Sequence, residues 1–268
     1  MIKFLSISSG SCGNCYYFSN GSTAFLIDAG VGVRATKKAL SEHDLSLEKI
    51  DFILITHDHI DHIKALGTLC KRYNKIAYTT PSLKRALLQH RITAEDVKGS
   101  IKELKILKNN DICGVNVIPF KVPHDATETV GYYIEFENKG ITLVTDCGEV
   151  TNDVLKFSKR ADVLIFETNY DEKMLKNGNY SDALKSRISD SHHGHLSNTN
   201  AAEALKEIYM NKEGSLEYLF LCHLSENNNT PKLAKQCVIE ALASVGATRE
   251  EILITPLLRG KPSILYSI

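Results

Sequence analysis

The densest chemical signal in the chain is THDHIDH, Thr56–His62, which directly follows the apolar run FILI. His57 and His59 stand two positions apart, so both imidazoles can point the same way from an extended backbone. Asp61 and His62 follow at the expected start of a helix and can face a neighbouring point. Four nitrogen and oxygen donors packed this densely at the end of a strand indicate a metal site rather than a solvated loop.

Three further donors each follow an apolar run: His124 after VIPFKVP, Asp146 after ITLVT and His223 after YLFLC. Taken singly, each is more often structural. Taken together they indicate one ligand site, because α/β folds place ligands at the carboxyl ends of strands. The full set is five histidines and two aspartates with no thiolate. Such donors suit two divalent ions bridged by a carboxylate and a water, with Zn²⁺ or Mn²⁺ expected.

The elements that must position these donors alternate along the chain. Two strands are expected within CYYFSNGSTAFLIDAG, joined at the Asn20–Gly21 turn. Other strands are expected at IKFLSISS, DFILIT, KIAYTT, across residues 101–146, and at ADVLIFET, EYLFLCH and EILIT. Helices are expected at residues 33–43, 60–73, 81–91, 199–210 and 230–246. Since no linker or low-complexity tract interrupts the pattern, one α/β domain with mixed sheets over residues 1–268 is predicted.

Composition excludes several classes of protein. Lysine plus arginine and aspartate plus glutamate both number 32, so nucleic acid would have to bind at local patches. No apolar run is long enough to span a membrane, and the first residues lack a secretory signal, so a cytoplasmic protein without membrane association is expected. Seven cysteines argue against a disulfide framework. The lone pair Cys12 and Cys15 is interpreted as structural, with a redox or accessory metal role left open.

The donor series resembles the metal-binding motif of the metallo-β-lactamase superfamily, and the resemblance covers the whole chain. It implies an αββα sandwich, with two mixed β-sheets face to face and helices outside. It also implies two metal ions that share one carboxylate. The implied ligands are His57, His59 and His124 for one metal, Asp61, His62 and His223 for the other, and Asp146 as the bridge.

This ligand set leaves the second histidine cluster, SDSHHGHLSN, for another role. Glu167 ends the apolar strand of IFETNY, and His195 lies just before an expected helix. Both features resemble the phosphodiesterase branch of the superfamily, where such residues form a proton-handling pair beside the scissile phosphate. The resemblance implies that His195 donates a proton to a phosphate oxygen or leaving group, oriented by Glu167. Asp61 is expected to accept a proton as well as bind metal.

Substrate contacts are expected around two helix starts. Ser197 and Asn198 precede or open the helix after His195, where N–H groups suit a phosphate. Asn227 lies in HLSENN, shortly before Pro231 at an expected first helical position. His192 and His193 stay open between a solvated loop and substrate contact.

The short spacing between the motifs narrows the choice among subgroups of the superfamily. Ser191 stands only 24 positions after Glu167, which leaves no room for a β-CASP cap. The motifs SGSxGN, THDHIDH, FETNYD, HHGHLSN and HLSENN resemble the small YycJ/WalJ-type group of metal-dependent exonucleases. That group implies 5′-to-3′ exonuclease activity on DNA, with a possible role in DNA repair.

Two functions are therefore carried forward. The first is a dinuclear-metal phosphodiesterase that acts on DNA ends, with DNA favoured over RNA as partner. The alternative is a small-molecule hydrolase on the same metal site: a cyclic-nucleotide phosphodiesterase, a thioesterase or a lactonase. Zero net charge favours the alternative. The Glu167–His195 pair favours phosphodiester chemistry, because lactones and thioesters need less help at the leaving group. The oligomeric state stays open.

Overall fold

The computed structural model describes residues 1–248 and 250–268, which divide into two compact units. Unit 1 comprises Met1–Pro119, Ala126–Glu128 and Leu258–Ile268, and unit 2 comprises Phe120–Asp125 and Thr129–Leu257. The expectation of a single domain over residues 1–268, without a β-CASP cap, stays a prediction.

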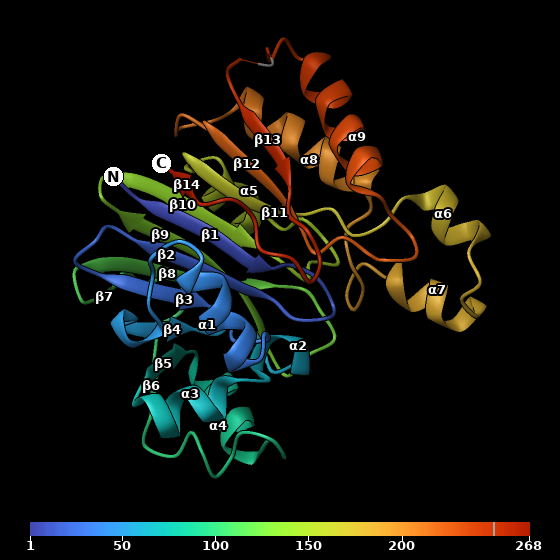
Figure 1. The fold of residues 1–268 in the computed structure, drawn as a ribbon. Coiled ribbons are helices and arrows are strands. Elements are labelled where there is room, and N and C mark those ends of the chain that lie inside the picture. Colours follow the sequence, from blue (N-terminus) through green and yellow to red (C-terminus); the bar gives the residue numbers. More distant parts are fainter. Residues whose placement is uncertain (249) are drawn as a thin grey trace. The chain divides into compact units, whose positions relative to one another are not determined.

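Unit 1 is built on a seven-stranded sheet in the order β14-β1-β2-β3-β4-β5-β6 (Figure 1). The strands from β14 to β3 pair antiparallel, and those from β3 to β6 pair parallel. A short hairpin, β7 with the first part of β8, completes the strands of this unit. The strands are β1 Lys3–Ser8, β2 Cys15–Ser19, β3 Ala24–Ile27, β4 Phe52–Leu54, β5 Ile76–Thr79, β6 Ile101–Glu103, β7 Asn110–Ile112, β8 Val115–Val122 and β14 Tyr266–Ser267. The helices are α1 Val33–Ser41, the 3₁₀ helix η1 Leu47–Lys49, α2 Ile60–Ile63, α3 Leu66–Tyr73 and α4 Pro81–Gln89.

The predicted hairpin at Asn20–Gly21 is confirmed by the antiparallel pairing of β2 with β3. The Asn20 side chain accepts hydrogen bonds from the backbone N–H groups of Ser22 and Thr23, at 3.0 and 2.7 Å. Gly21 has a φ of +96°, a conformation that glycine adopts at little cost. The turn therefore forms from local chemistry alone.

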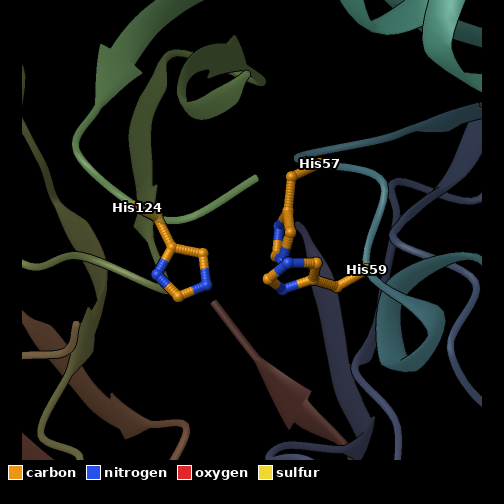
Figure 2. A group of neighbouring side chains, drawn as sticks. All are labelled: His57, His59 and His124. Atoms are coloured by element: carbon orange, nitrogen blue, oxygen red, sulfur yellow. The ribbon is translucent and has the colours of Figure 1, made fainter. Parts of the chain in front are cut away.

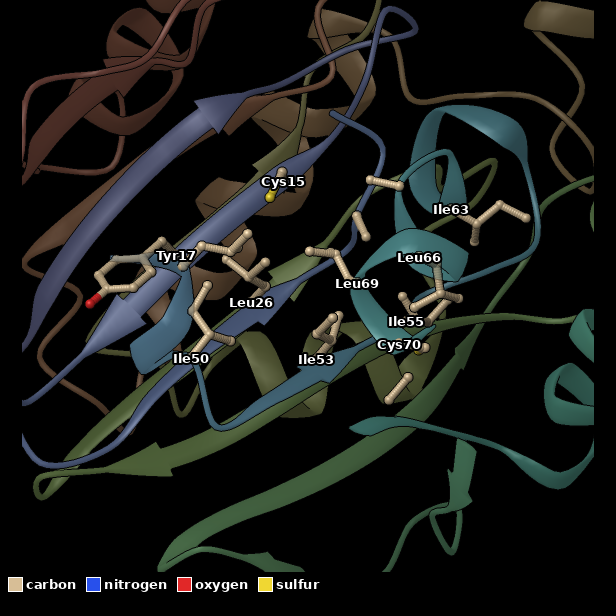
Figure 3. Packing of buried hydrophobic residues seen from close by; sticks show 14 of the residues in the cluster. Cys15, Tyr17, Leu26, Ile50, Ile53, Ile55, Ile63, Leu66, Leu69 and Cys70 are labelled. Atoms are coloured by element: carbon tan, nitrogen blue, oxygen red, sulfur yellow. The ribbon is translucent and has the colours of Figure 1, made fainter. Parts of the chain in front are cut away.

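Burial of apolar side chains on both faces of this sheet explains its stability. On one face, Leu26 of β3 and Ile53 of β4 belong to a buried cluster with Leu69 of α3 (Figure 3). On the other face, a row of rings crosses four strands at centroid distances of 4.8, 5.3 and 5.0 Å. The row consists of Phe4, Phe18, Phe25 and Phe52. Strands buried on both faces read as continuous apolar runs, as FILI does.

One predicted element is wrong in its continuity. The single helix expected over residues 60–73 is divided into α2 and α3. Ala29 causes the break, because its N–H donates to the carbonyl of His62 at 2.7 Å and its carbonyl accepts from Ala65 at 2.8 Å. These bonds replace helical ones and tie the segment His62–Ala65 to the chain just after β3.

Unit 2 contains a mixed sheet in the order β13-β12-β11-β10-β9. Strands β9 and β10 pair antiparallel, and those from β10 to β13 pair parallel. The strands are β9 Thr129–Phe136, β10 Lys139–Val144, β11 Val163–Glu167, β12 Tyr218–Cys222 and β13 Leu253–Pro256. The helices are α5 Asn152–Ser158, α6 Glu172–Asn177, α7 Asp182–Ile188, α8 Asn198–Met210 and α9 Pro231–Ala243. Helix α8 packs on α9 and on α5, and α9 packs on β13 (Figure 1).

The helices α5, α6 and α7 were not predicted. For α6 and α7 the reason lies in their burial. Only Leu175 of α6 is buried, and no residue of α7 is buried. An amphipathic pattern is therefore missing, and the ends are set by local capping. Asp171 accepts from the N–H of Met174, and Ser181 accepts from the N–H of Leu184. Within residues 1–248 and 250–268, no helix has the length and apolar character needed to cross a membrane.

Candidate metal centre and proton-donor pair

In unit 1 the histidine motif begins two residues after β4. The His57 and His62 side chains are fully buried, and their rings lie 4.0 Å apart between centroids. The rings of His57 and His59 are 4.7 Å apart and meet edge to face (Figure 2). The imidazole of His57 thus lies beside those of both His59 and His62, and imidazole is the donor type that Zn²⁺ and other borderline metals prefer.

A buried carboxylate that sequence reasoning missed orients His62. Asp28 is fully buried with a left-handed φ of +63°, and its Oδ2 lies 2.7 Å from Nδ1 of His62. The Thr56 hydroxyl donates to the same carboxylate, and its oxygen lies 3.0 Å from Nδ1 of His57. Burial raises the pKa of Asp28, whereas His62 and Thr56 oppose that rise. Because the carboxylate contacts Nδ1, Nε2 is the nitrogen of His62 that would bind a metal.

Asn14, in the turn SGSCGN, supports the same loop. Its amide donates to Nε2 of His62 at 2.9 Å, and its backbone N–H donates to the carbonyl of Asp61 at 2.7 Å. The Asn14 carbonyl in turn accepts from the N–H of Gly30 at 2.9 Å. The segment Asp61–His62 is thus fixed by hydrogen bonds from two separate loops. Binding of a metal by Nε2 would require the Asn14 amide to give up its bond to that nitrogen.

In unit 2 the predicted donors His124, Asp146 and His223 stand just after β8, β10 and β12. Oδ1 of Asp146 lies 3.6 Å from Nε2 of His124 and 3.5 Å from Nε2 of His223 (His124 is drawn in Figure 2). His124 directs Nε2 this way because its Nδ1 contacts the carbonyl of Gly194 at 3.0 Å. Burial lowers the pKa of His124, which favours the neutral imidazole that binds metals. The same carboxylate oxygen therefore lies near both Nε2 atoms, and the expected bridging role of Asp146 stays a prediction.

The backbone at two of these positions explains the sharp exit of the chain from the sheet. Asp146 and His223 have left-handed φ values of +52° and +54°. Such conformations cost non-glycine residues about 1–2 kcal/mol and concentrate at functional sites. Both side chains are turned toward one point by this local strain.

The structure brings Glu167 and His195 together. Oε1 of the fully buried Glu167 lies 2.8 Å from Nδ1 of His195 and 3.2 Å from Nδ1 of His223. Its Oε2 accepts from the N–H groups of Cys147 and Leu196 at 2.8 and 3.1 Å. Burial would raise the pKa of Glu167, but the charge and hydrogen bonds of His195, with the hydrogen bond of His223, lower it. The ionised carboxylate orients both rings, so its contact with His223 extends the role that the sequence indicated.

The donor chemistry of unit 2 fits a metal ion. Ligand atoms of Asp146, Glu167, His195 and His223 all lie within 4.8 Å of one another. Nδ1 of His195 is 3.8 Å from Asp146 but is engaged by Glu167 at 2.8 Å. His195 thus lies closer to Glu167 than to Asp146, and its expected role as a proton donor rather than a ligand stays a prediction.

The three expected substrate contacts lie in different environments. Ser197 and Asn198 are buried: the Ser197 hydroxyl caps α8 by accepting from Asn200, and the Asn198 amide pairs with Asn229. Asn227 is exposed, and its amide donates to the Tyr180 hydroxyl. His192 and His193 are exposed, and Asp190 accepts from both of their N–H groups. Their roles toward substrate stay predictions.

The two CxxC cysteines do not act together in this structure, since Cys12 is exposed and Cys15 is buried in the core of unit 1 (Figure 3). Burial, with the nearby charge of Asp28, raises the pKa of the Cys15 thiol, so it stays protonated and is a poor ligand. The double variant Cys12→Ser/Cys15→Ser should keep its metal content by elemental analysis, and thiol-blocking reagents should leave activity intact. Loss of metal in the double variant would assign the cysteines to the site.

Comparison with known proteins identifies the class. A family model described as a β-lactamase superfamily domain matches residues 23–215, so the chain belongs to this superfamily. The exodeoxyribonuclease YycJ of Bacillus anthracis is 32% identical over 249 residues, covering 91% of this chain and 90% of the relative. The exodeoxyribonuclease WalJ of Streptococcus pneumoniae is 32% identical over 242 residues, covering 90% of this chain and 88% of the relative.

Solved structures confirm the predicted fold class. Zn²⁺-bound PqqB from Methylobacterium extorquens has a TM-score of 0.72 at 18% identity, covering 97% of this chain and 99% of that one. The metallo-β-lactamase fold protein YhfI from Bacillus subtilis has a TM-score of 0.69 at 16% identity, covering 98% of both chains. The resemblance to the metallo-β-lactamase superfamily and to YycJ/WalJ-type proteins is therefore confirmed.

Proposed function

We propose that this protein is a metal-dependent exonuclease that hydrolyses phosphodiester bonds at DNA ends in the 5′-to-3′ direction. The Glu167–His195 pair carries the proposal, because its 2.8 Å contact sets a proton donor beside Asp146. The two curated relatives described above are named exodeoxyribonucleases and match nine-tenths of the chain. A role in DNA repair in the cytoplasm goes with this activity.

The proposed ligand set is the one that the donor motif implies. His57, His59 and His124 would hold one ion, and Asp61, His62 and His223 the other, with Asp146 shared. Nitrogen and oxygen donors without thiolate suit Zn²⁺ or Mn²⁺. Two such ions would supply an activated water and stabilise charge on the phosphate oxygens.

The residues of the chain have separate tasks in this reaction. Asp28 and Glu167 hold the rings of His62 and His223 by contacts to Nδ1. Asp61 accepts the proton of the attacking water. Nδ1 of His195 faces an ionised carboxylate, so Nε2 is the nitrogen that delivers a proton to the departing oxygen.

The deciding experiment supplies end-labelled single- and double-stranded DNA, RNA and bis(p-nitrophenyl) phosphate, each with Mn²⁺, Zn²⁺ or Mg²⁺. Release of nucleotides from the 5′ end of DNA is the expected result. A cyclic nucleotide, a thioester and a lactone are assayed in parallel, and hydrolysis of any of them without cleavage of DNA would instead support the small-molecule hydrolase.

The proposed ligands predict the metal content. The wild-type protein should bind about two ions per chain, the stoichiometry of a dinuclear site. His59→Ala and Asp146→Ala should each bind less by elemental analysis, because each removes one donor. His43→Ala is the control, since His43 lies two residues after α1 and outside the motif. Unchanged metal in both ligand variants would refute the assignment.

A further inference from the structure

A small pocket of unit 2 opens beside the proposed proton donor. It measures about 140 Å³ and is lined by His195, by His193 and by Arg187 at the end of α7. Asp125, Leu184, Ile188 and Gly194 complete its wall. None of the polar side chains in this pocket apart from His195 has a task in the reaction described above.

The pocket has a fixed shape on the side of the histidine loop. The N–H of His195 donates to the carbonyl of Ile188 at 2.9 Å, and that of Gly194 donates to Asp190 at 2.8 Å. A Cβ atom on Gly194 would lie 2.2 Å from the Ile188 carbonyl and 2.6 Å from that of Arg187. The loop therefore lies directly against the end of α7, which fixes the position of Arg187 relative to His195.

Hydrogen bonds orient the two basic side chains of the wall. Nε and Nη2 of Arg187 both donate to Oδ2 of Asp125, the first at 2.7 Å. One edge of the guanidinium is thereby used, and the edge that carries Nη1 has no hydrogen-bond partner among the described residues. Nδ1 of His193 contacts Asp190 at 2.9 Å, which makes Nε2 its remaining ligand-binding atom.

Because Asp125 neutralises part of the positive charge of Arg187, net charge alone would not make the pocket bind every anion. It offers a planar guanidinium edge and an imidazole nitrogen at the side of His195. Such a pair matches the oxygens of a phosphate group, which arginine binds through two parallel N–H bonds.

We infer that this pocket binds the phosphate adjacent to the scissile one, with Arg187 and His193 as its ligands. The inference rests on the proposed function and deepens it, because His195 lines the same pocket and acts on the scissile phosphate. The substrate is then a chain with at least two successive phosphates. A diester with a single phosphate leaves the pocket unused.

The test compares Arg187→Ala with wild type on single-stranded DNA and on bis(p-nitrophenyl) phosphate. The KM for DNA should rise roughly 10- to 100-fold, the scale of a charge-assisted hydrogen bond, with little change in kcat. Both parameters for bis(p-nitrophenyl) phosphate should stay unchanged. The slope of log affinity for single-stranded DNA against log salt should fall by about 0.7, since one phosphate contact is lost.

Two controls separate this role from others. Lys185→Ala removes one positive charge from the same helix, where the Lys185 ammonium donates to the Lys176 carbonyl, and should leave KM nearly unchanged. Asp125→Asn keeps the charge of Arg187 but weakens the contact that orients it, so KM should rise less than in Arg187→Ala; metal content is measured alongside, because Oδ1 of Asp125 lies 3.3 Å from Nε2 of His124. A rise in KM for Lys185→Ala equal to that for Arg187→Ala would overturn the inference in favour of general electrostatic attraction.

Failure of the inference can be told from failure of the proposed function. If wild type does not cut DNA, the proposed exonuclease is wrong, and oligothymidylate is then used to inhibit bis(p-nitrophenyl) phosphate hydrolysis. An inhibition constant that rises at least tenfold in Arg187→Ala, but not in Lys185→Ala, would still support the pocket. An inhibition constant that is equal in wild type and Arg187→Ala would overturn it.

Discussion

His195→Ala should keep the metal content and fold of the wild-type protein but lose roughly 10²–10⁴-fold in the rate of DNA cleavage, the usual scale for general acid catalysis. The departing alkoxide needs a proton, and the Nδ1 contact with Glu167 at 2.8 Å leaves Nε2 of His195 to supply it. Single-turnover cleavage of labelled DNA, alongside elemental analysis, measures both effects.

The loss should shrink for bis(p-nitrophenyl) phosphate, because p-nitrophenolate departs without a proton. His192→Ala is the matched control, since His192 lies three positions away with a side chain 73% exposed. Metal loss in His195→Ala would make His195 a ligand. An equal rate loss for DNA and the activated ester would make its role electrostatic.

Glu167→Gln should affect metal binding as well as the rate, whereas His195→Ala should affect the rate alone. Glu167 contacts Nδ1 of both His195 and His223 and accepts from two backbone N–H groups. An amide keeps only part of these bonds and removes the charge that favours both rings as donors. We therefore expect a lower metal affinity together with the slower rate, whereas His195→Ala changes the rate alone.

Gly30→Ala should destabilise the protein by about 3 kcal/mol or more, the upper end of the cost of overpacking. Its Cβ atom would lie 1.6 Å from the carbonyl oxygen of Asp61 and 2.7 Å from the backbone nitrogen of Asn14. Both neighbours are backbone atoms, so relief requires the Asp61–His62 segment to move. Metal affinity should therefore fall together with the melting temperature, measured by calorimetry and by metal titration.

Gly32→Ala provides the control two positions along the same loop. Apart from its chain neighbours, no atom of the described residues lies within 4 Å of a Cβ atom at Gly32, which precedes α1 with a φ of −58°. Its cost should stay within about 1 kcal/mol, the scale of an N-cap substitution, with metal affinity unchanged. Equal melting temperatures and metal affinities in the two variants would contradict the close packing of Gly30 against Asp61.

The parts of the fold and the site that could be predicted are those that depend on residues close together in the sequence. THDHIDH follows an apolar strand, so its position at a sheet edge could be read from the chain, as could Thr80–Pro81 and Thr230–Pro231 at helix starts. Asp28 could not, since its partner His62 is 34 positions away and a lone aspartate after a strand has no distinctive signal. The division of residues 60–73 likewise depends on Ala29, a distant backbone group. Helix α7 could not be predicted from a helical periodicity of apolar residues, because it buries no residue.

The strand order of unit 1 has a consequence for synthesis on the ribosome. The edge of β1 is paired by β14, Tyr266–Ser267, from the segment Leu258–Ile268 that returns to this unit last. While the chain emerges, β1 exposes its backbone N–H and C=O groups until those residues leave the exit tunnel. An uncovered edge is a template for pairing with other nascent chains. Nascent polypeptides stalled before Leu258 should therefore depend on chaperones more than the released chain does.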